Sequence, residues 1–231
     1  MKNSSLTRSQ NGIARIVPVF IILLVAAFGA IAMPQYQDRD RDHDRDRDRD
    51  FGGIFVTREQ VVQDFGGGRG GRPSRDAMCG PDSVAVGFHV QTGEYFNEAW
   101  LDCVHVRRDG DLADDVYLTE RTGSRGGRPV SDAFCPNGSA LRGLRGRTGA
   151  SIDTAAGFCS PLRDIAYRSN RPHTEMTQEV ARPGAGGHPS EALCPPGGVI
   201  TGFRSNSGEY MDHLWIVCSE VRPFDRDHDR R

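Results

Sequence analysis

The residues best suited to chemistry in this sequence are six cysteines, which fall into three pairs of equal spacing. The members of each pair are 24 positions apart: Cys79 and Cys103, Cys135 and Cys159, and Cys194 and Cys218. Six cysteines allow fifteen pairings, and one bond within each pair gives three equivalent units the same disulfide. An even cysteine count in an exported chain favours oxidation. Each closed loop would stabilise the fold by about 3 to 4 kcal/mol.

A metal site is the alternative use of these thiols. Zinc ligands usually come as closely spaced pairs such as Cys-x-x-Cys. The separation of 24 positions within each pair argues against that arrangement. We therefore expect three disulfides, and neither a metal nor another cofactor.

Hydrogen-bond acceptors beside glycine recur in the same three units. Downstream of the first cysteine of each unit, a glycine before an apolar residue recurs at Gly87, Gly143 and Gly202. A second glycine recurs at Gly93, Gly149 and Gly208, and an Asn or Asp follows it at Asn97, Asp153 and Asp212. Upstream of the same cysteine, paired glycines recur at Gly70-Gly71, Gly126-Gly127 and Gly186-Gly187. So many matches at similar offsets predict a threefold internal repeat. Each Asn or Asp could accept hydrogen bonds from a ligand, or it could simply bond the backbone of its own turn.

The segments that must position these residues have the pattern of strands. Apolar residues alternate in stretches such as 84–90, and no segment carries a sustained helical stripe with caps. A unit of about 55 residues with three or four strands cannot cover its own apolar face. Three units packed about one axis can do so. We expect one all-β domain over residues 53–223, with repeats at about 53–110, 111–168 and 169–223.

One repeat position carries a large aromatic residue in two of the three units. Trp100 and Trp215 occupy this position, and the second unit has Ala156 there. Large aromatic side chains contribute most when they are buried. We expect the two indoles to pack in the core or at a vertex of the fold rather than to bind a ligand.

The two ends of the chain differ in composition from this domain. Residues 1–32 combine positive charge with an apolar run and end in Ala30-Ile31-Ala32, which is typical of a cleaved export signal. An uncleaved membrane anchor is the alternative. Residues 33–52 and 224–231 are dominated by Asp and Arg, which predicts a disordered linker and tail. We expect the domain to be secreted or otherwise extracytoplasmic, with membrane contact only if the anchor is retained.

Composition narrows the classes of function. The chain has 231 residues, of which 26% are charged and 37% apolar, which excludes a multi-span membrane protein and a wholly disordered chain. Its 29 basic and 31 acidic residues nearly cancel, which argues against a nucleic-acid-binding surface. The sequence has no nucleophile elbow, zinc-protease helix, P-loop or dinucleotide motif. We therefore expect no enzymatic activity.

The repeated residues resemble those of known families. The paired-glycine turn and the downstream Gly-x-x-x-Asp loop resemble the jacalin-related lectins. The threefold repeat with cysteines and Gly-Phe is also similar to vitelline membrane outer layer protein I, and the stretch from Cys194 to Trp215 has a weaker likeness to dermatopontin-like repeats. The first two resemblances imply a β-prism, in which three Greek-key sheets surround one axis.

The lectin resemblance also implies a set of binding residues. In jacalin-type lectins the Asp of the loop accepts hydrogen bonds from sugar hydroxyls, nearby backbone N–H groups donate to them, and the paired glycines form the opposing wall. The implied residues are Gly149, Ala150, Ser151 and Asp153; Gly208, Glu209, Tyr210 and Asp212; Gly93, Tyr95 and Asn97; and Gly70, Gly71, Gly126, Gly127, Gly186 and Gly187. The first loop departs from the motif because Asn97 is a neutral acceptor. Gly70 and Gly71 are expected to face the third loop, and Tyr95 and Tyr210 to present a ring to a sugar.

These observations together predict a secreted, lectin-like module that binds carbohydrate without catalysis. Its expected partners are glycans or cell-surface polysaccharide. The alternative is a structural extracellular protein, a scaffold or matrix component that binds other proteins or itself.

Overall fold

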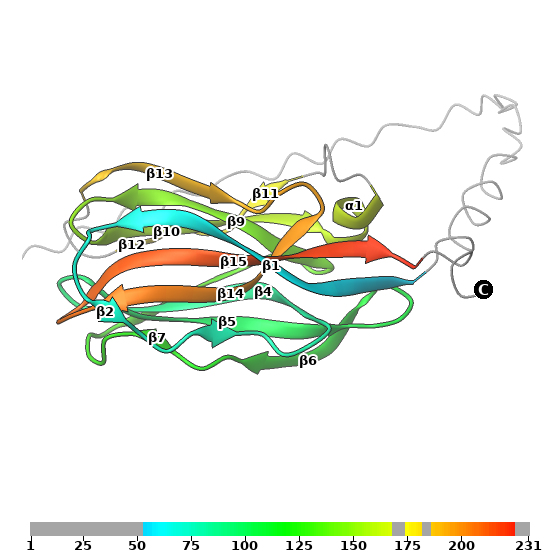
Figure 1. Ribbon diagram of the computed structural model, residues 1–231, viewed down its shortest axis with the longest axis horizontal. Coiled ribbons are helices and arrows are strands. Elements are labelled where there is room, and N and C mark those ends of the chain that lie inside the picture. The colour runs from blue at the N-terminus through cyan, green and yellow to red at the C-terminus, as the bar shows by residue number, and fades with distance from the viewer. Residues whose placement is uncertain (1–52, 168–173, 182–185, 225–231) are drawn as a thin grey trace, which may run out of the picture. The chain divides into compact units, whose positions relative to one another are not determined.

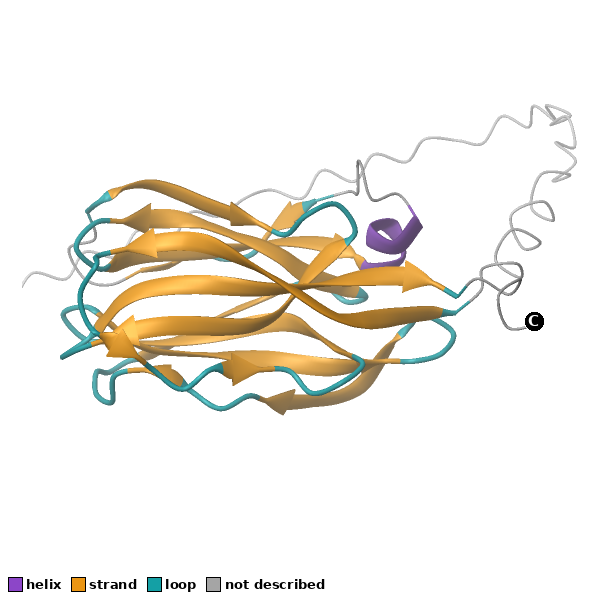
Figure 2. Cartoon of the chain, viewed as in Figure 1, coloured by secondary structure: helices purple, strands orange, loops and turns teal. Residues whose placement is uncertain are grey.

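The computed structural model describes residues 53–167, 174–181 and 186–224. These residues form three antiparallel sheets of five strands and one short helix, α1 (Leu162–Tyr167), as Figures 1 and 2 show. The expected all-β class is therefore confirmed. The expected signal, the linker and the tail beyond residue 224 lie outside the described residues. Within the described ranges, α1 is too short to cross a membrane.

Each sheet has a Greek-key order, in which a fourth strand returns to lie beside the first. Sheet 1 contains, in order, β6 (Leu112–Leu118), β5 (Phe96–Val106), β4 (Ser83–Thr92) and β8 (Val130–Phe134), with β7 (Thr122–Gly123) also paired to β5. Sheet 2 contains β11 (Glu175–Met176), β10 (Ile152–Pro161), β9 (Ser139–Thr148) and β13 (His188–Leu193), with β12 (Val180–Ala181) also paired to β10. Sheet 3 contains β1 (Ile54–Gly67), β15 (Met211–Pro223), β14 (Gly198–Ser207) and β2 (Arg72–Pro73), with β3 (Ala77–Met78) also paired to β14. This is the threefold β-prism architecture that the resemblance implies.

The sheets are offset from the sequence repeats. Sheets 1 and 2 are each built from one continuous stretch of chain, whereas sheet 3 combines the first three strands with the last two. In sheet 3, β1 and β15 pair from Ile54 opposite Pro223 to Gly67 opposite His213. Strands β1 to β5, β6 to β10 and β11 to β15 are therefore three successive runs of chain, each of which contributes to two sheets.

The three disulfides follow the expected pairing, and each one joins two different sheets. Cys79–Cys103 links the end of β3 in sheet 3 to β5 in sheet 1, with a sequence separation of 24. Cys135–Cys159 links sheet 1 to sheet 2, and Cys194–Cys218 links sheet 2 to sheet 3. The three bonds therefore connect the sheets in a closed cycle.

The recurring glycine before an apolar residue lies at an irregularity in each sheet. Register shifts occur beside Gly87, Gly143 and Gly202. A Cβ at Gly87 would lie 2.6 Å from Phe134 Cδ1, so the bulge needs glycine for close approach of the fourth strand. The apolar residues that follow, Phe88, Leu144 and Phe203, are at most 1% exposed and belong to the core between the sheets.

We expect removal of one disulfide to weaken the fold without changing its architecture. Replacing Cys135 and Cys159 together by alanine should lower the free energy of unfolding by about 3 kcal/mol, because the unfolded chain gains the freedom of a 25-residue loop. Urea unfolding followed by circular dichroism measures the change. The unmodified protein treated with a thiol reductant, which opens all three bonds, should lose more. Equal stability of the double variant and the unmodified protein would contradict this role.

Candidate functional site

The Gly-x-x-x-Asp or Asn loop of each sheet joins its two long central strands and lies against a paired-glycine turn. The structure places Asp212 beside Gly70 and Gly71 in sheet 3, Asp153 beside Gly187 in sheet 2, and Asn97 beside Gly127 in sheet 1. In each case the glycines lie just before the fourth strand of the same sheet. The offset of sheets and repeats thus brings each loop to the paired glycines of a different repeat.

Asp212 faces the backbone of the Gly70-Gly71 turn at close range. Gly71 has a φ of +75°, and a Cβ there would lie 2.5 Å from Asp212 Oδ2. The N–H of Gly68 donates to the carbonyl of Asp212 at 2.7 Å, which fixes the turn to the loop. The Oδ2 atom is buried, and no described residue donates a hydrogen bond to it. Its carboxylate therefore has acceptor capacity that the fold does not use.

Asp153 occupies the equivalent place in sheet 2 and is only 2% exposed. Gly187 has a φ of +69°, and its missing side chain leaves room for Asp153 Oδ2. The guanidinium of Arg147 donates to the carbonyls of Gly186 at 2.8 Å and Gly187 at 2.5 Å. Arg147 therefore holds this paired-glycine turn from the side of β9.

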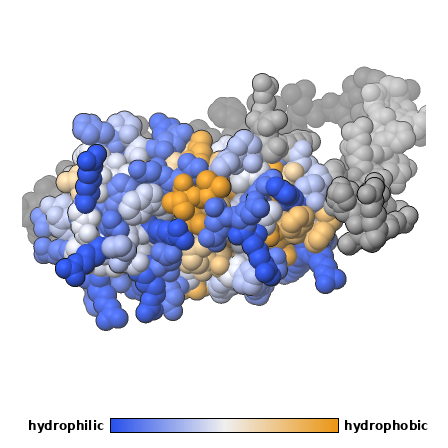
Figure 3. All heavy atoms as spheres, viewed as in Figure 1, coloured by the Kyte–Doolittle hydropathy of each residue, from blue (hydrophilic) through white to orange (hydrophobic). Residues whose placement is uncertain are grey.

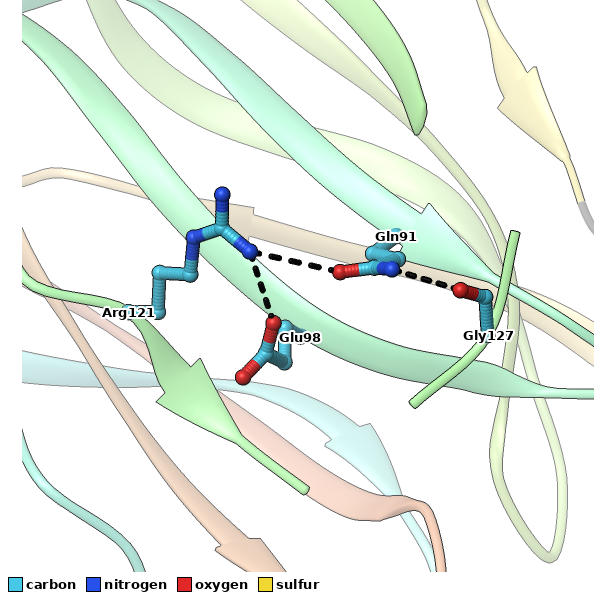
Figure 4. A network of polar contacts seen from close by, with 4 residues as sticks. All are labelled: Gln91, Glu98, Arg121 and Gly127. Carbon is cyan, nitrogen blue, oxygen red and sulfur yellow. Dashed lines mark hydrogen bonds and ion pairs between the residues drawn. The ribbon is translucent and has the colours of Figure 1, made fainter. Parts of the chain in front are cut away.

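Asn97 of sheet 1 is held beside a turn that is tied to the outer face of the sheet. Gln91 Nε2 donates to the carbonyl of Gly127 at 2.5 Å. Arg121 in turn donates to Gln91 Oε1 at 3.4 Å and to Glu98 Oε2 at 3.1 Å, as Figure 4 shows. This network leads from the turn to the surface of β5.

The loops of sheets 1 and 3 touch each other. The rings of Tyr95 and Tyr210 stack with centroids 4.2 Å apart, and Ser124 Oγ donates to the carbonyl of Gly208 at 2.6 Å. The two tyrosines, which we expected to present rings to a sugar, thus each turn one face toward the other. In sheet 2 the residue that corresponds to these tyrosines is Ser151, which is buried, and Ala150 before it is exposed.

One polar pair that the sequence analysis missed lies on the outer face of sheet 1. His89 Nε2 is 2.7 Å from Asp102 Oδ2, and their side chains are 17% and 6% exposed. Burial raises the pKa of Asp102, and the contact with His89 opposes that rise. In place of Asp102, sheets 2 and 3 have the apolar residues Phe158 and Val217. This departure from the repeat was the sequence signal that could have identified the pair. Within the described ranges, His, Cys, Asp and Glu form no group of three or more suited to a metal ion.

The expected likeness to jacalin-related lectins has counterparts among solved structures. The chain is similar to Calsepa lectin in complex with a biantennary N-glycan, with 15% identity, a TM-score of 0.45 and coverage of 71% of this chain and 99% of that one. It is also similar to artocarpin complexed with Me-alpha-mannose (13% identity, TM-score 0.47, coverage 71% and 99%). A third similar structure is a mannose-binding jacalin-related lectin from Ananas comosus (16% identity, TM-score 0.43, coverage 71% and 99%). No protein-family model and no curated protein matches the sequence.

Neighbouring glycines of the sheet 2 turn should respond differently to the same substitution. Gly187→Ala should lower the free energy of unfolding by about 1 to 3 kcal/mol, because alanine is strained at positive φ and its Cβ would meet Asp153 and the backbone of Thr148. Gly186→Ala is the matched control, since a Cβ at Gly186 has no atom within 4 Å. Urea unfolding of both variants measures the difference, and equal stability would show that the close approach is unimportant.

The buried carboxylate on sheet 1 should make stability depend on pH. Because the folded-state pKa of Asp102 is raised, this group favours folding below about pH 4 and loses that contribution as pH rises through the raised value. Asp102→Asn should therefore stabilise the protein at pH 8, where the carboxylate is ionised, and have a smaller effect at pH 3.5. Thermal unfolding at both pH values measures this. Asp115→Asn, at an exposed residue of β6, is the control, since Asp115 does not contribute to the shift at Asp102. A gain confined to low pH would contradict burial of the carboxylate as the cause.

Proposed function

We propose that this protein is a secreted, lectin-like carbohydrate-binding protein that acts without catalysis. Its binding sites in this proposal are the loops in which an Asp or Asn faces a paired-glycine turn. The ligands are glycans, whose hydroxyl groups both donate and accept hydrogen bonds.

One observation carries the proposal: the unused acceptor on Asp212. A buried carboxylate oxygen without a hydrogen-bond donor costs free energy, and no described residue supplies a donor to Asp212 Oδ2. A sugar hydroxyl can donate to such a carboxylate while it accepts from backbone N–H groups. The Gly70-Gly71 turn lets its backbone come close because neither residue has a side chain. Charge-assisted hydrogen bonds of this kind are about twice as strong as neutral ones.

The three loops should differ in strength. Asp212 and Asp153 carry the charge that strengthens a hydrogen bond from a hydroxyl, whereas Asn97 is neutral. The Asp153 residue is 2% exposed, whereas Asp212 as a whole is half-buried, so a ligand reaches the Asp153 side chain less easily. We therefore rank the Asp212 loop first and the Asn97 loop last.

A structural extracellular scaffold is the second candidate. The observation that favours it is the cycle of disulfides, since each of the three bonds joins neighbouring sheets. The stacking of Tyr95 on Tyr210 also uses aromatic surface for cohesion of the fold. In this alternative, Asp212 would serve only its own turn.

Export is part of the proposal. Residues 1–32 would be removed during export, so that the mature chain begins near Met33. N-terminal sequencing of the protein recovered outside the cytoplasm would identify the first residue. An N-terminus at Met1 in a membrane fraction would instead support the uncleaved anchor.

Asp212→Asn should reduce glycan binding by about 10- to 100-fold without unfolding the protein. This range corresponds to loss of one charge-assisted hydrogen bond of roughly 1.5 to 3 kcal/mol. The fold accepts asparagine here, because sheet 1 has Asn97 at the equivalent position. A glycan array identifies the ligand, and isothermal titration with that ligand measures affinity and stoichiometry.

Asn97→Asp is the matched control for this experiment. It introduces into the first loop the charge that the other two loops have, and binding at that loop should strengthen. If Asp212→Asn lowers the melting temperature strongly, Asp212 is a turn residue and the scaffold candidate gains support. Full binding by Asp212→Asn together with Asp153→Asn would refute the proposed sites.

A further inference from the structure

The outer faces of sheets 1 and 3 each carry a tryptophan that sheet 2 lacks. Trp100 in β5 stacks on His89 with 5.1 Å between ring centroids, and the guanidinium of Arg121 lies 4.2 Å from the indole centroid. Trp215 occupies the same place in β15, three residues before its cysteine, with the ring of His213 at 4.2 Å. The equivalent residue of β10 is Ala156. Trp100 is 4% exposed and is therefore buried, as expected, whereas Trp215 is partly exposed. Neither indole belongs to the central cluster of core residues, and both lie on the outer side of their sheets.

Sheets 1 and 3 each have an ion pair beside the tryptophan, and the described residues of sheet 2 form none at the equivalent place. Arg121 pairs with Glu98 at 3.1 Å in sheet 1, and His213 pairs with Asp64 at 2.7 Å in sheet 3. In sheet 2, Thr154 takes the place of Glu98 and His213. Glu179 takes the place of Arg121, because Val180 pairs with Ala155 as Thr122 pairs with Ala99. Thr154 Oγ1 is buried, and no described residue forms a hydrogen bond with it.

These differences leave a groove of about 410 Å³ on the outer face of sheet 2. Ala156 lines it together with Arg145, which lies opposite Ala156 in the register of β9 and β10. Met176, which is 45% exposed, and Glu179 line it from the side of β11 and β12. These edge strands have two residues each, compared with seven in β6 and fourteen in β1, so they cover less of the sheet.

We propose that this groove binds a planar aromatic group, an indole or phenol ring carried by a ligand. The same chain shows the arrangement filled: Arg121 lies over the indole of Trp100 in sheet 1. By register, the counterpart of Arg121 in sheet 2 is Glu179, and Arg145 takes the place of His89, whose ring stacks on Trp100. Arg145 therefore offers a guanidinium for stacking on a ligand ring from the place that His89 has in sheet 1. The thioether of Met176 makes favourable contacts with aromatic rings, and the carboxylate of Glu179 accepts an N–H or O–H from the ring.

The groove adjoins the Asp153 loop but does not depend on it for binding. Arg147 lines the groove and also donates to the carbonyls of Gly186 and Gly187. A ligand that carries an aromatic ring would thus bind beside the paired-glycine turn of sheet 2. The inference stands on the missing tryptophan of sheet 2 and is independent of sugar binding.

Free indole is the probe for the experiment, and the methyl groups of methionine are the reporters. In protein labelled with ¹³C at the methionine methyls, indole should shift the Met176 resonance upfield and saturably, with a Kd in about the millimolar range. Met211, which is 0% exposed, and Met78, which packs on Gly202, serve as references that should not move. Cyclohexanol, a non-aromatic ring, should have little effect. An equal response to cyclohexanol, or no response of Met176 to indole, would overturn the proposal.

Substitutions test the same site from the side of the protein. Ala156→Trp should fill the groove and weaken the indole response at least 10-fold. Arg145→Ala, at an exposed residue, should weaken it about 5-fold with an unchanged melting temperature, and it keeps the proposal testable if Ala156→Trp fails to fold. An unchanged indole response in Arg145→Ala and in a folded Ala156→Trp variant would overturn the proposal.

Trp100→Ala is the matched control, because it creates in sheet 1 the hollow that sheet 2 has naturally. We expect its melting temperature to fall by about 10 °C and indole to restore part of the loss. Rescue of Trp100→Ala without any shift at Met176 would show that indole fits such a hollow but not the groove of sheet 2. That result would overturn the proposal.

Discussion

In this protein the fourth strand of each sheet leads directly into the first central strand of the next sheet, and a disulfide lies at each of these three junctions. The cysteine that follows the fourth strand still donates its N–H to the sheet it leaves: Cys79 to Thr201, Cys135 to Val86 and Cys194 to Arg142. Its sulfur is bonded to a central strand of the neighbouring sheet. A junction held at both ends cannot slide, so the relative placement of the three sheets follows from it. The inward-facing side chains then meet between the sheets in two clusters of buried residues.

This arrangement also decides which residues meet at the candidate sites. The fourth strand of each sheet lies just upstream of the first cysteine of the next pair. The paired glycines that precede this strand therefore lie against the Asp or Asn loop of the sheet that the strand completes. Close approach of backbone and carboxylate is possible there only without side chains, as at Gly71 and Gly187. The outer faces of the sheets are freer to vary, and Trp100, Ala156 and Trp215 show that variation at one position. In Figure 3, the visible face of the described domain is mostly hydrophilic, with hydrophobic side chains gathered in a patch near its middle.

The features that depend on local sequence were predictable, and those that depend on distant pairing were not. The spacing of the cysteines predicted the three disulfides, and alternation predicted strands such as β4. The residue pattern did not show that β1 completes a sheet with β15, because that contact joins segments about 150 residues apart. The pairing of Gly71 with Asp212 was implied by the family resemblance alone. His89 and Asp102 were missed because a bulge at Gly87 changes which face the later residues occupy.

The pairing of β1 with β15 brings the two ends of the domain together. The N–H of Phe224 donates to the carbonyl of Gly53 at 2.6 Å, so the domain is in effect a ring that has been cut at one point. Joining these ends by a short peptide and opening the chain in the exposed turn at residues 107–109 would give a circular permutant in which sheet 3 is one continuous stretch. The point at which the chain begins is therefore separable from the order of the three sheets around the axis.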